Sequence, residues 1–418
     1  MLSIMGQSAA IAHLQRVIAA GRMAATWIFS GPPGVGKYRT AIALARTCLC
    51  ENPRHARNQQ ANGLLNPALE PDFDMILACD QCESCRAIDH DAHPDLHLIY
   101  RNLIRCHDRS GKSKGTTLSI DVIRGEITGD DSEEHRVEPK LYKRSQHGRG
   151  KWFIIDEADL MEPPAQNALL KALEEPPPQS FLVMIATSPA ELLATIRSRS
   201  QWVSFRSLPP AVLVPQFVQR GLTQSQAKLL ARLSDGSLGR AVRWLSLQEP
   251  VRPVEDEHAS PCSPPALGIG SRRREAAEKQ PAIFECIERI SLAMDNLATG
   301  RAGAMVLVDA VRAYAEQYAR MALREDPLSS KDRAVRDGAA ILLGFVAAWL
   351  DDRLRYAIGS PIEAPLPSTQ QALPPAAMVQ CLDLCQTAQR QVDMNAHVGL
   401  LLAATATELE VEIRRCRS

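Results

Sequence analysis

Three hydrophobic runs in the first half of the chain predict buried β-strands, at TWIFS (26–30), KWFIIDEAD (151–159) and FLVMIATS (181–188). Between them, RTAIALARTCLC (39–50) and PAQNALLKALEE (164–175) carry hydrophobic residues at the spacing of an amphipathic helix. Strands that alternate with helices predict a parallel sheet covered by helices on both faces. The first half of the chain is therefore expected to be an α/β domain.

The pattern changes after residue 207, where helical periodicity continues almost without a strand signal. A stretch rich in proline, serine and charge is typical of a linker, and the segments beyond it repeat helical spacing. The expected domains are an α/β core at 1–207, a small helical unit at 208–248, a linker at 249–275 and an all-α domain at 276–418.

The charge balance limits what the protein can bind on its own. Lysine and arginine together number 48 and equal the 48 acidic residues, so no overall field attracts the chain to nucleic acid or membranes. The start of the chain lacks a signal-peptide pattern and no run of about 18 apolar residues follows, which predicts a cytoplasmic protein. The 11 cysteines are accordingly expected to be metal ligands or buried thiols.

A phosphate-binding loop follows the first predicted strand. The sequence GPPGVGK, with Gly31, Gly34, Gly36 and Lys37, fits the pattern G-x-x-x-x-G-K. Glycines allow backbone N–H groups to surround phosphate oxygens, and the lysine reaches the terminal phosphates. The next position needs the hydroxyl of serine or threonine as a Mg²⁺ ligand, but Tyr38 stands there and its hydroxyl is a ring's length too far out.

An acidic pair, Asp156 and Glu157, ends the second predicted strand. In phosphate-loop ATPases such a pair holds Mg²⁺ and orients the attacking water. The alternative is a solvated charge pair at the end of a strand. The presence of a phosphate loop in the same chain favours the ATPase interpretation over this alternative.

The segments FIIDEADLMEPPAQNALLKALEEPP (153–177) and IATSPAELLATIRSRSQ (185–201) resemble the clamp-loader branch of the AAA+ ATPases. The cysteine pattern resembles its bacterial members, the γ/τ and δ′ subunits of DNA polymerase III. The resemblance covers about the first 245 residues strongly, and QVDMNAHVGLLLAATATELE (391–410) looks like the last helices of δ′ collar domains. It implies an AAA+ core, a helical lid and a C-terminal collar.

The resemblance implies roles for individual residues. Arg199, in Ser-Arg-Ser, occupies the place of the clamp-loader Ser-Arg-Cys motif and would be an arginine finger that reaches the γ-phosphate bound by the neighbouring subunit. The alternative is a surface arginine near a strand end. Thr187 stands at the sensor-1 position. Arg240 lies near sensor 2, but the γ-type arginine would fall at Gly239, so a working sensor 2 stays open.

Tyr38 distinguishes among the subunits of this family. Subunits of the δ′ type keep the fold and the arginine finger while they lose parts of their own ATP site, which makes δ′ the primary interpretation. It implies a hetero-oligomer with γ/τ and δ subunits that acts on the sliding clamp and primed DNA. Lys37 and Glu157 leave binding of ATP and Mg²⁺ open, so an active γ/τ-type motor is the alternative. A zinc-dependent adaptor with no role in replication is a third interpretation.

The triplet Cys79, Cys82 and Cys85, in CDQCESC, offers three thiolates, and tetrahedral Zn²⁺ requires four ligands. The family resemblance points to Cys50 as the fourth ligand, with Cys48 as the alternative, in a structural zinc module at about 48–90. A redox role for C-x-x-C is less consistent with a triplet. The insert NPRHARNQQANGLLNPALEPDF (52–73) is expected to be a surface loop.

A second insert, at 101–150, places an acidic cluster beside basic residues. These basic residues are Arg136, Lys140, Lys143, Arg144, Arg149 and Lys151. They are compatible with contacts to a DNA backbone. A solvated, mobile loop is the preferred interpretation, because the acidic cluster cancels much of the field.

Overall fold

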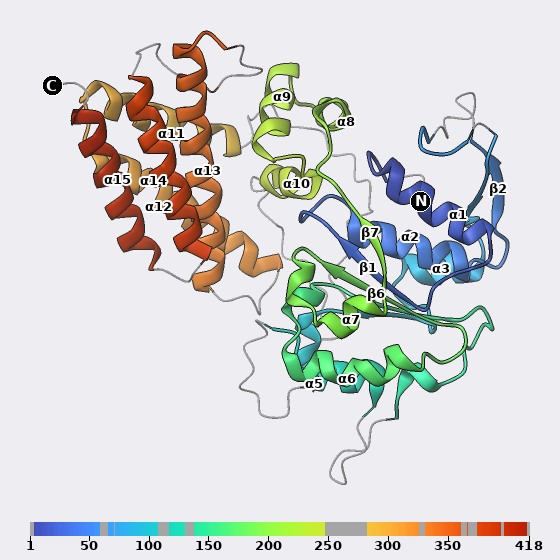
Figure 1. The fold of residues 1–418 in the computed structure, drawn as a ribbon. Coiled ribbons are helices and arrows are strands. Elements are labelled where there is room, and N and C mark those ends of the chain that lie inside the picture. Colours follow the sequence, from blue (N-terminus) through green and yellow to red (C-terminus); the bar gives the residue numbers. More distant parts are fainter. Residues whose placement is uncertain are drawn as a thin grey trace. The chain divides into compact units, whose positions relative to one another are not determined.

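The computed structural model describes residues 4–58, 66–70, 72–107, 117–129, 138–246, 282–325, 331–360, 366, 374–393 and 397–415. The described residues form two compact units (Figure 1). The first contains residues up to 212 together with Gly236–Gly239, and the second contains Leu213–Asp235 and the described residues from 240 onward. The predicted linker at 249–275 lies outside the described residues.

The first unit is built on a five-stranded sheet with the order β4-β5-β6-β1-β7, in which every pairing is parallel. Its strands are β1 (Thr26–Ser30), β4 (Leu96–Ile99), β5 (Lys151–Ile155), β6 (Ser180–Ala186) and β7 (Gln201–Ser204). All five residues of β1 and of β5 are buried, as expected for strands covered on both faces. The predicted α/β class is confirmed.

Helices cover both faces of this sheet, with α1, α2 and α3 on one side and α5 and α6 on the other (Figure 1). The helices of the first unit are α1 (Ser8–Ala19), α2 (Lys37–Leu49), α3 (Glu83–Asp89), α4 (Ile104–His107), α5 (Ile120–Ile123), α6 (Pro163–Glu174) and α7 (Ala194–Ser198). The core between the sheet and α2 contains the fully buried side chains of Trp27, Phe29 and Trp152, and Phe181 stacks on Trp152. This packing fixes α2, which begins at the phosphate loop.

The first insert was predicted to be a surface loop, and this prediction is wrong for Arg54–Arg57, which form a strand that is mostly exposed. Strands β2 (Arg54–Arg57) and β3 (Asp74–Leu77) pair antiparallel. The buried amide of Gln15 in α1 donates to the Ile76 carbonyl and accepts from its N–H, both at 2.9 Å. The Gln15 side chain thus makes the two hydrogen bonds with the Ile76 backbone that a neighbouring strand would otherwise make. Hydrophobic periodicity cannot reveal this arrangement.

The described part of the second insert is also held in place. The buried carboxylate of Asp95 accepts hydrogen bonds from the Ser145 hydroxyl and from the backbone N–H groups of Gln146 and His147, each at 2.9 Å. Gln146 and His147 lie in an exposed loop, as predicted, and Asp95 fixes the backbone of that loop. One of the predicted basic residues, Arg136, lies outside the described part of the chain. The acidic cluster before it also lies outside the described part.

The second unit is all-helical in its described residues, as predicted. It contains most of α8 (Pro210–Val218), then α9 (Gln224–Leu233), α10 (Leu238–Ser246), α11 (Ala282–Thr299), α12 (Ala304–Glu325), α13 (Lys331–Ala357), α14 (Pro375–Asp393) and α15 (Val398–Arg415). Trp244 of α10 packs edge-on against Phe345 of α13. Among the described helices, none is long and apolar enough to cross a bilayer.

Candidate nucleotide and metal sites

The phosphate loop connects β1 directly to α2. Gly31 has φ +142°, and a Cβ there would lie 2.2 Å from the Phe205 carbonyl oxygen. Gly36 caps α2 with φ +106° in the left-handed region, so the helix begins at Lys37 with its N–H groups facing the loop. The predicted glycines thus lie where only glycine fits without strain.

A segment far along the chain closes over this loop. The Ser237 hydroxyl donates to the Pro33 carbonyl at 2.8 Å, and the Gly239 N–H donates to the Gly34 carbonyl at 2.9 Å. A Cβ at position 239 would lie 2.8 Å from the Gly34 Cα. A side chain larger than glycine at this position would push the two backbones apart, so Gly239 permits their close approach.

Lys37 bends back onto its own loop. Its ammonium donates to the Gly31 carbonyl at 2.5 Å and to the Pro32 carbonyl at 2.7 Å. Burial lowers the Lys37 pKa, while the negative charges of Asp156 and Asp159 oppose this effect. A phosphate would have to displace these carbonyls to reach the ammonium.

Tyr38 packs its ring against the hydrophobic core under the sheet. Burial is the main reason that the Tyr38 pKa is raised above its usual value. Thr40, the next hydroxyl in α2, is fully buried and donates to the Gly36 carbonyl at 2.8 Å. The Thr40 hydroxyl is therefore engaged within α2 and is not available as an inner-sphere Mg²⁺ ligand.

The acidic pair lies at the end of β5, beside the phosphate loop. Burial, and secondarily the charge of Glu157, raises the pKa of Asp156 to about 6. Glu157 has φ +51°, an uncommon conformation for a non-glycine residue. Its Oε2 lies 2.8 Å from the Nε of Arg101, a residue that the sequence interpretation did not single out because β4, which precedes it, was not recognised.

Thr187 lies at the end of β6, as predicted. Its backbone N–H and that of Ser188 both donate to Oδ2 of Asp159 at 3.1 Å. Asp159 therefore fixes the backbone at Thr187, whose side chain is exposed. The sequence interpretation missed this contribution of Asp159, although the residue stands only two positions after the acidic pair.

Arg199 directly follows α7. Its Nη2 lies 3.0 Å from Oε1 of Glu174, and its Nη1 donates to the Thr195 carbonyl at 3.2 Å. Arg240 belongs to the second unit, where it lines a cavity of about 550 Å³ together with Trp244 and Phe345.

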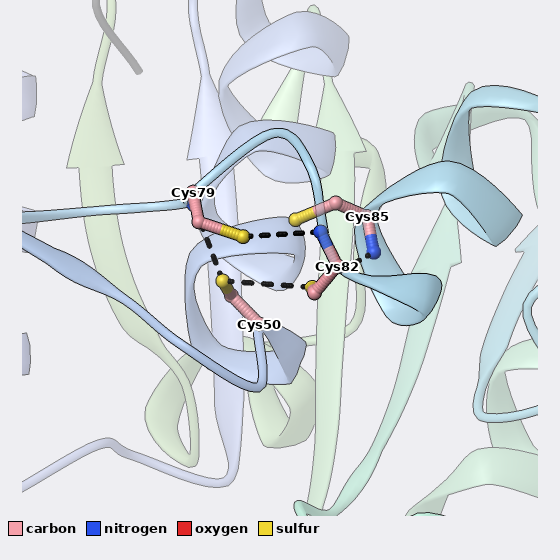
Figure 2. A group of neighbouring side chains, drawn as sticks. All are labelled: Cys50, Cys79, Cys82 and Cys85. Carbon is pink, nitrogen blue, oxygen red and sulfur yellow. Dashed lines mark hydrogen bonds between the residues drawn. The ribbon is translucent and has the colours of Figure 1, made fainter.

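The four predicted cysteine ligands converge in space. The sulfur atoms of Cys50, Cys79, Cys82 and Cys85 all lie within 4.8 Å of one another. Cys50 follows the last residue of α2, while the other three lie on the turn before α3 and in its first turn, and Figure 2 shows their side chains pointing toward one centre. Cys48 is not in this group and packs against the hydrophobic core.

The surroundings of these thiols suit a metal bound through thiolates. Backbone N–H groups of Cys79 and Cys82 donate to the sulfurs of Cys50 and Cys79 at 3.2 Å. Hydrogen bonds from backbone N–H groups, first that of Gln81, lower the Cys79 pKa to about 6, whereas burial raises the pKa values of Cys50 and Cys85. Four converging sulfurs match the closed, tetrahedral Cys₄ geometry of structural zinc and leave no position for a catalytic water.

The first unit is similar to known proteins. A family model described as "DNA polymerase III, delta subunit" matches residues 6–209. The DNA polymerase III subunit delta' of Bacillus subtilis is 28% identical over 51% of this chain and 52% of its own length, and that of Escherichia coli is 29% identical over 53% and 55%. The resemblance to bacterial δ′ subunits is thereby confirmed.

The chain is also similar to gamma/tau subunits of DNA polymerase III. The gamma/tau subunit of Mycobacterium tuberculosis (strain H37Rv) is 30% identical over 56% of this chain and 34% of its own length. The chain thus spans about half the length of the δ′ relatives it matches and a third of this γ/τ subunit. Identity alone does not separate the δ′ and γ/τ subunits, so that assignment depends on the sites.

Proposed function

We propose that this chain is the δ′ subunit of a bacterial clamp loader, a non-motor AAA+ subunit that supplies Arg199 to the ATP site of a neighbouring γ/τ subunit. In this role it assembles with γ/τ and δ through its C-terminal helices. The assembly loads the sliding clamp onto primed DNA in the cytoplasm. The relatives named delta' and gamma/tau support this assignment at the level of the complex.

The observation that carries the proposal is the packing of the partly buried Tyr38 against the core next to the phosphate loop. An ATPase motor of this class needs a small hydroxyl there to ligate Mg²⁺. A tyrosine ring that packs against the core cannot supply it without giving up that contact. The chain's own site is therefore expected to hydrolyse ATP slowly or not at all.

Arg199 has the location that a finger acting on another subunit requires. Its side chain is 38% exposed, and both of its contacts given above come from α6 and α7 rather than from the phosphate loop. An arginine that supplies charge to a neighbouring phosphate must be accessible at the surface. The Cys₄ cluster is assigned to structural Zn²⁺, away from this chemistry.

An active γ/τ-type motor is the second candidate. Lys37, Asp156 and Glu157 are all present at the loop. Burial raises the pKa of Asp156, and a bound cation would favour the ionised form of this carboxylate. Thr187 and Arg240 would then act as sensors of the chain's own nucleotide. This candidate requires Mg²⁺ to be held without the missing hydroxyl.

ATP turnover by the reconstituted loader, with clamp and primed DNA, distinguishes the two candidates. Arg199→Ala is expected to lower turnover well beyond Lys37→Ala, because the finger acts on a neighbouring site. Arg197→Ala, two residues earlier in α7, is the matched control for loss of a nearby positive charge. If Lys37→Ala is the more damaging substitution, the chain is a motor and the δ′ assignment is wrong.

A further inference from the structure

The ion pair between Arg199 and Glu174 occupies the guanidinium that the proposed function assigns to a neighbouring phosphate. We propose that Glu174 is a placeholder for that phosphate: its carboxylate holds Arg199 until a neighbouring subunit presents a nucleoside triphosphate. This inference rests on the proposed function of Arg199. It adds a positioning residue that controls when the finger is available.

The helix α7, which directly precedes Arg199, is fixed at its start. The buried amide of Gln166, in α6, donates to the carbonyls of Met161 and Glu191 at 3.0 and 3.1 Å and accepts from the Leu193 N–H at 2.7 Å. These bonds join the first half of α6 to the start of α7. A buried amide with three partners is costly to disrupt, so this end of α7 acts as a fixed support.

The contact at the other end of α6 has the opposite character. The side chains of Arg199 and Glu174 are 38% and 52% exposed. Exposed ion pairs are weak and exchange readily, whereas a phosphate offers more charge and several acceptor oxygens to the planar guanidinium. A triphosphate can therefore displace Glu174 while α7 stays anchored at Gln166.

The helix itself does not favour a carboxylate at position 174. Glu174 is the last residue of α6, and a negative charge near a helix C-terminus interacts unfavourably with the helix dipole. Arg199 offsets this unfavourable charge. The next residue, Glu175, is also exposed, and none of the described contacts pairs its side chain. It therefore provides a matched control of the same charge and location.

The experiment measures ATP turnover by the reconstituted loader with and without clamp and primed DNA, over a range of ATP concentrations. Every variant of this subunit also carries Lys37→Ala, so that the measured turnover comes from the neighbouring subunits. Glu174→Gln is expected to raise turnover without clamp and DNA about two- to fivefold, the range that an exposed ion pair supports. This rise applies below saturating ATP, because the ATP concentration at half-maximal rate should fall while the maximal rate stays the same. In the Glu175→Gln control, both quantities should equal those of the protein without this substitution.

The outcomes separate this inference from the function on which it rests. If Glu174→Gln behaves like Glu175→Gln while Arg199→Ala still lowers turnover, Glu174 is no placeholder but the finger stands. If Glu174→Gln instead lowers the maximal rate as Arg199→Ala does, Glu174 orients the finger productively, which overturns the inference. If Arg199→Ala has no effect, the proposed function itself fails.

Discussion

Oε2 of Glu157 lies 2.8 Å from Nε of Arg101, whose side chain is only 14% exposed. In an ATPase of this class the glutamate must accept a hydrogen bond from the attacking water. Arg101 already occupies this carboxylate, so an attacking water would have to compete with the guanidinium for it. The chain's own site thus has two obstacles, the tyrosine in the loop and the occupied glutamate.

The two obstacles lead to an ordered prediction for the isolated chain. Tyr38→Thr alone is expected to raise ATP turnover only slightly, since Glu157 remains paired with Arg101. Adding Arg101→Ala should raise turnover further, by about tenfold or more if general-base function returns. Steady-state ATPase assays on the single and double variants measure this. A large rise with Tyr38→Thr alone would instead support the motor candidate.

Metal content tests the cysteine cluster. The purified protein is expected to hold about one zinc per chain, in keeping with a closed four-thiolate site. Cys50→Ser should reduce the zinc content and lower the melting temperature, because metal binding contributes directly to the stability of such modules. Elemental analysis and thermal unfolding measure both effects.

Cys48→Ser is the matched control for this prediction. Cys48 lies two residues earlier in α2, and burial raises its pKa to about 12, as expected for a core thiol. Its substitution should leave the zinc content unchanged. Loss of zinc in Cys48→Ser with retention in Cys50→Ser would assign the fourth ligand to Cys48 instead.

Hydrophobic periodicity was sufficient for the elements at the centre of the fold. The strands around TWIFS, KWFII and FLVMIA and the long C-terminal helices follow continuous apolar runs or helical spacing over many residues. Strands β4 and β7 were missed because each has only four residues and lies at an edge of the sheet. Short edge strands are only partly buried, so their side chains carry little pattern.

The same distinction applies to the site residues: motifs of neighbouring residues were predicted from the sequence, whereas contacts between distant residues were not. The phosphate loop and the cysteine triplet are local motifs, since their spacing along the chain determines their geometry. The contacts of Arg101, Glu174 and Gly239 were not predicted, because the partner of each lies far away in sequence. Their importance arises only from the order of the strands, which the sequence pattern left undetermined.

Gly31 provides a test of how tightly the phosphate loop is packed. Gly31→Ala is expected to destabilise the protein by about 2–4 kcal/mol, because the added Cβ would lie 2.2 Å from a backbone oxygen that cannot move freely. Gly21→Ala is the control: this glycine has φ +61° with open space around it and should cost about 1–2 kcal/mol from backbone strain alone. Equal losses in chemical denaturation would contradict the packing argument.

His97 predicts a loss of stability in mild acid. Its ring stacks on Phe153 with 4.7 Å between centroids, and burial, followed by the charge of Lys140, lowers its pKa from 6.5 to about 4. Between these values the unfolded chain binds a proton that the folded chain does not. The contribution of His97 is therefore fully present above pH 6.5 and is lost as the pH falls toward 4.

The size of this effect follows from the shift in pKa. The free energy of unfolding should fall by roughly 2–3 kcal/mol between pH 7 and pH 4 through this group alone. His97→Phe keeps a stacked ring but cannot bind a proton, so its stability should depend less steeply on pH. The exposed His90 provides the control, since His90→Gln should leave the slope unchanged. Denaturation series at several pH values measure the slopes, and identical slopes for wild type and His97→Phe would show that His97 is protonated freely in the folded chain.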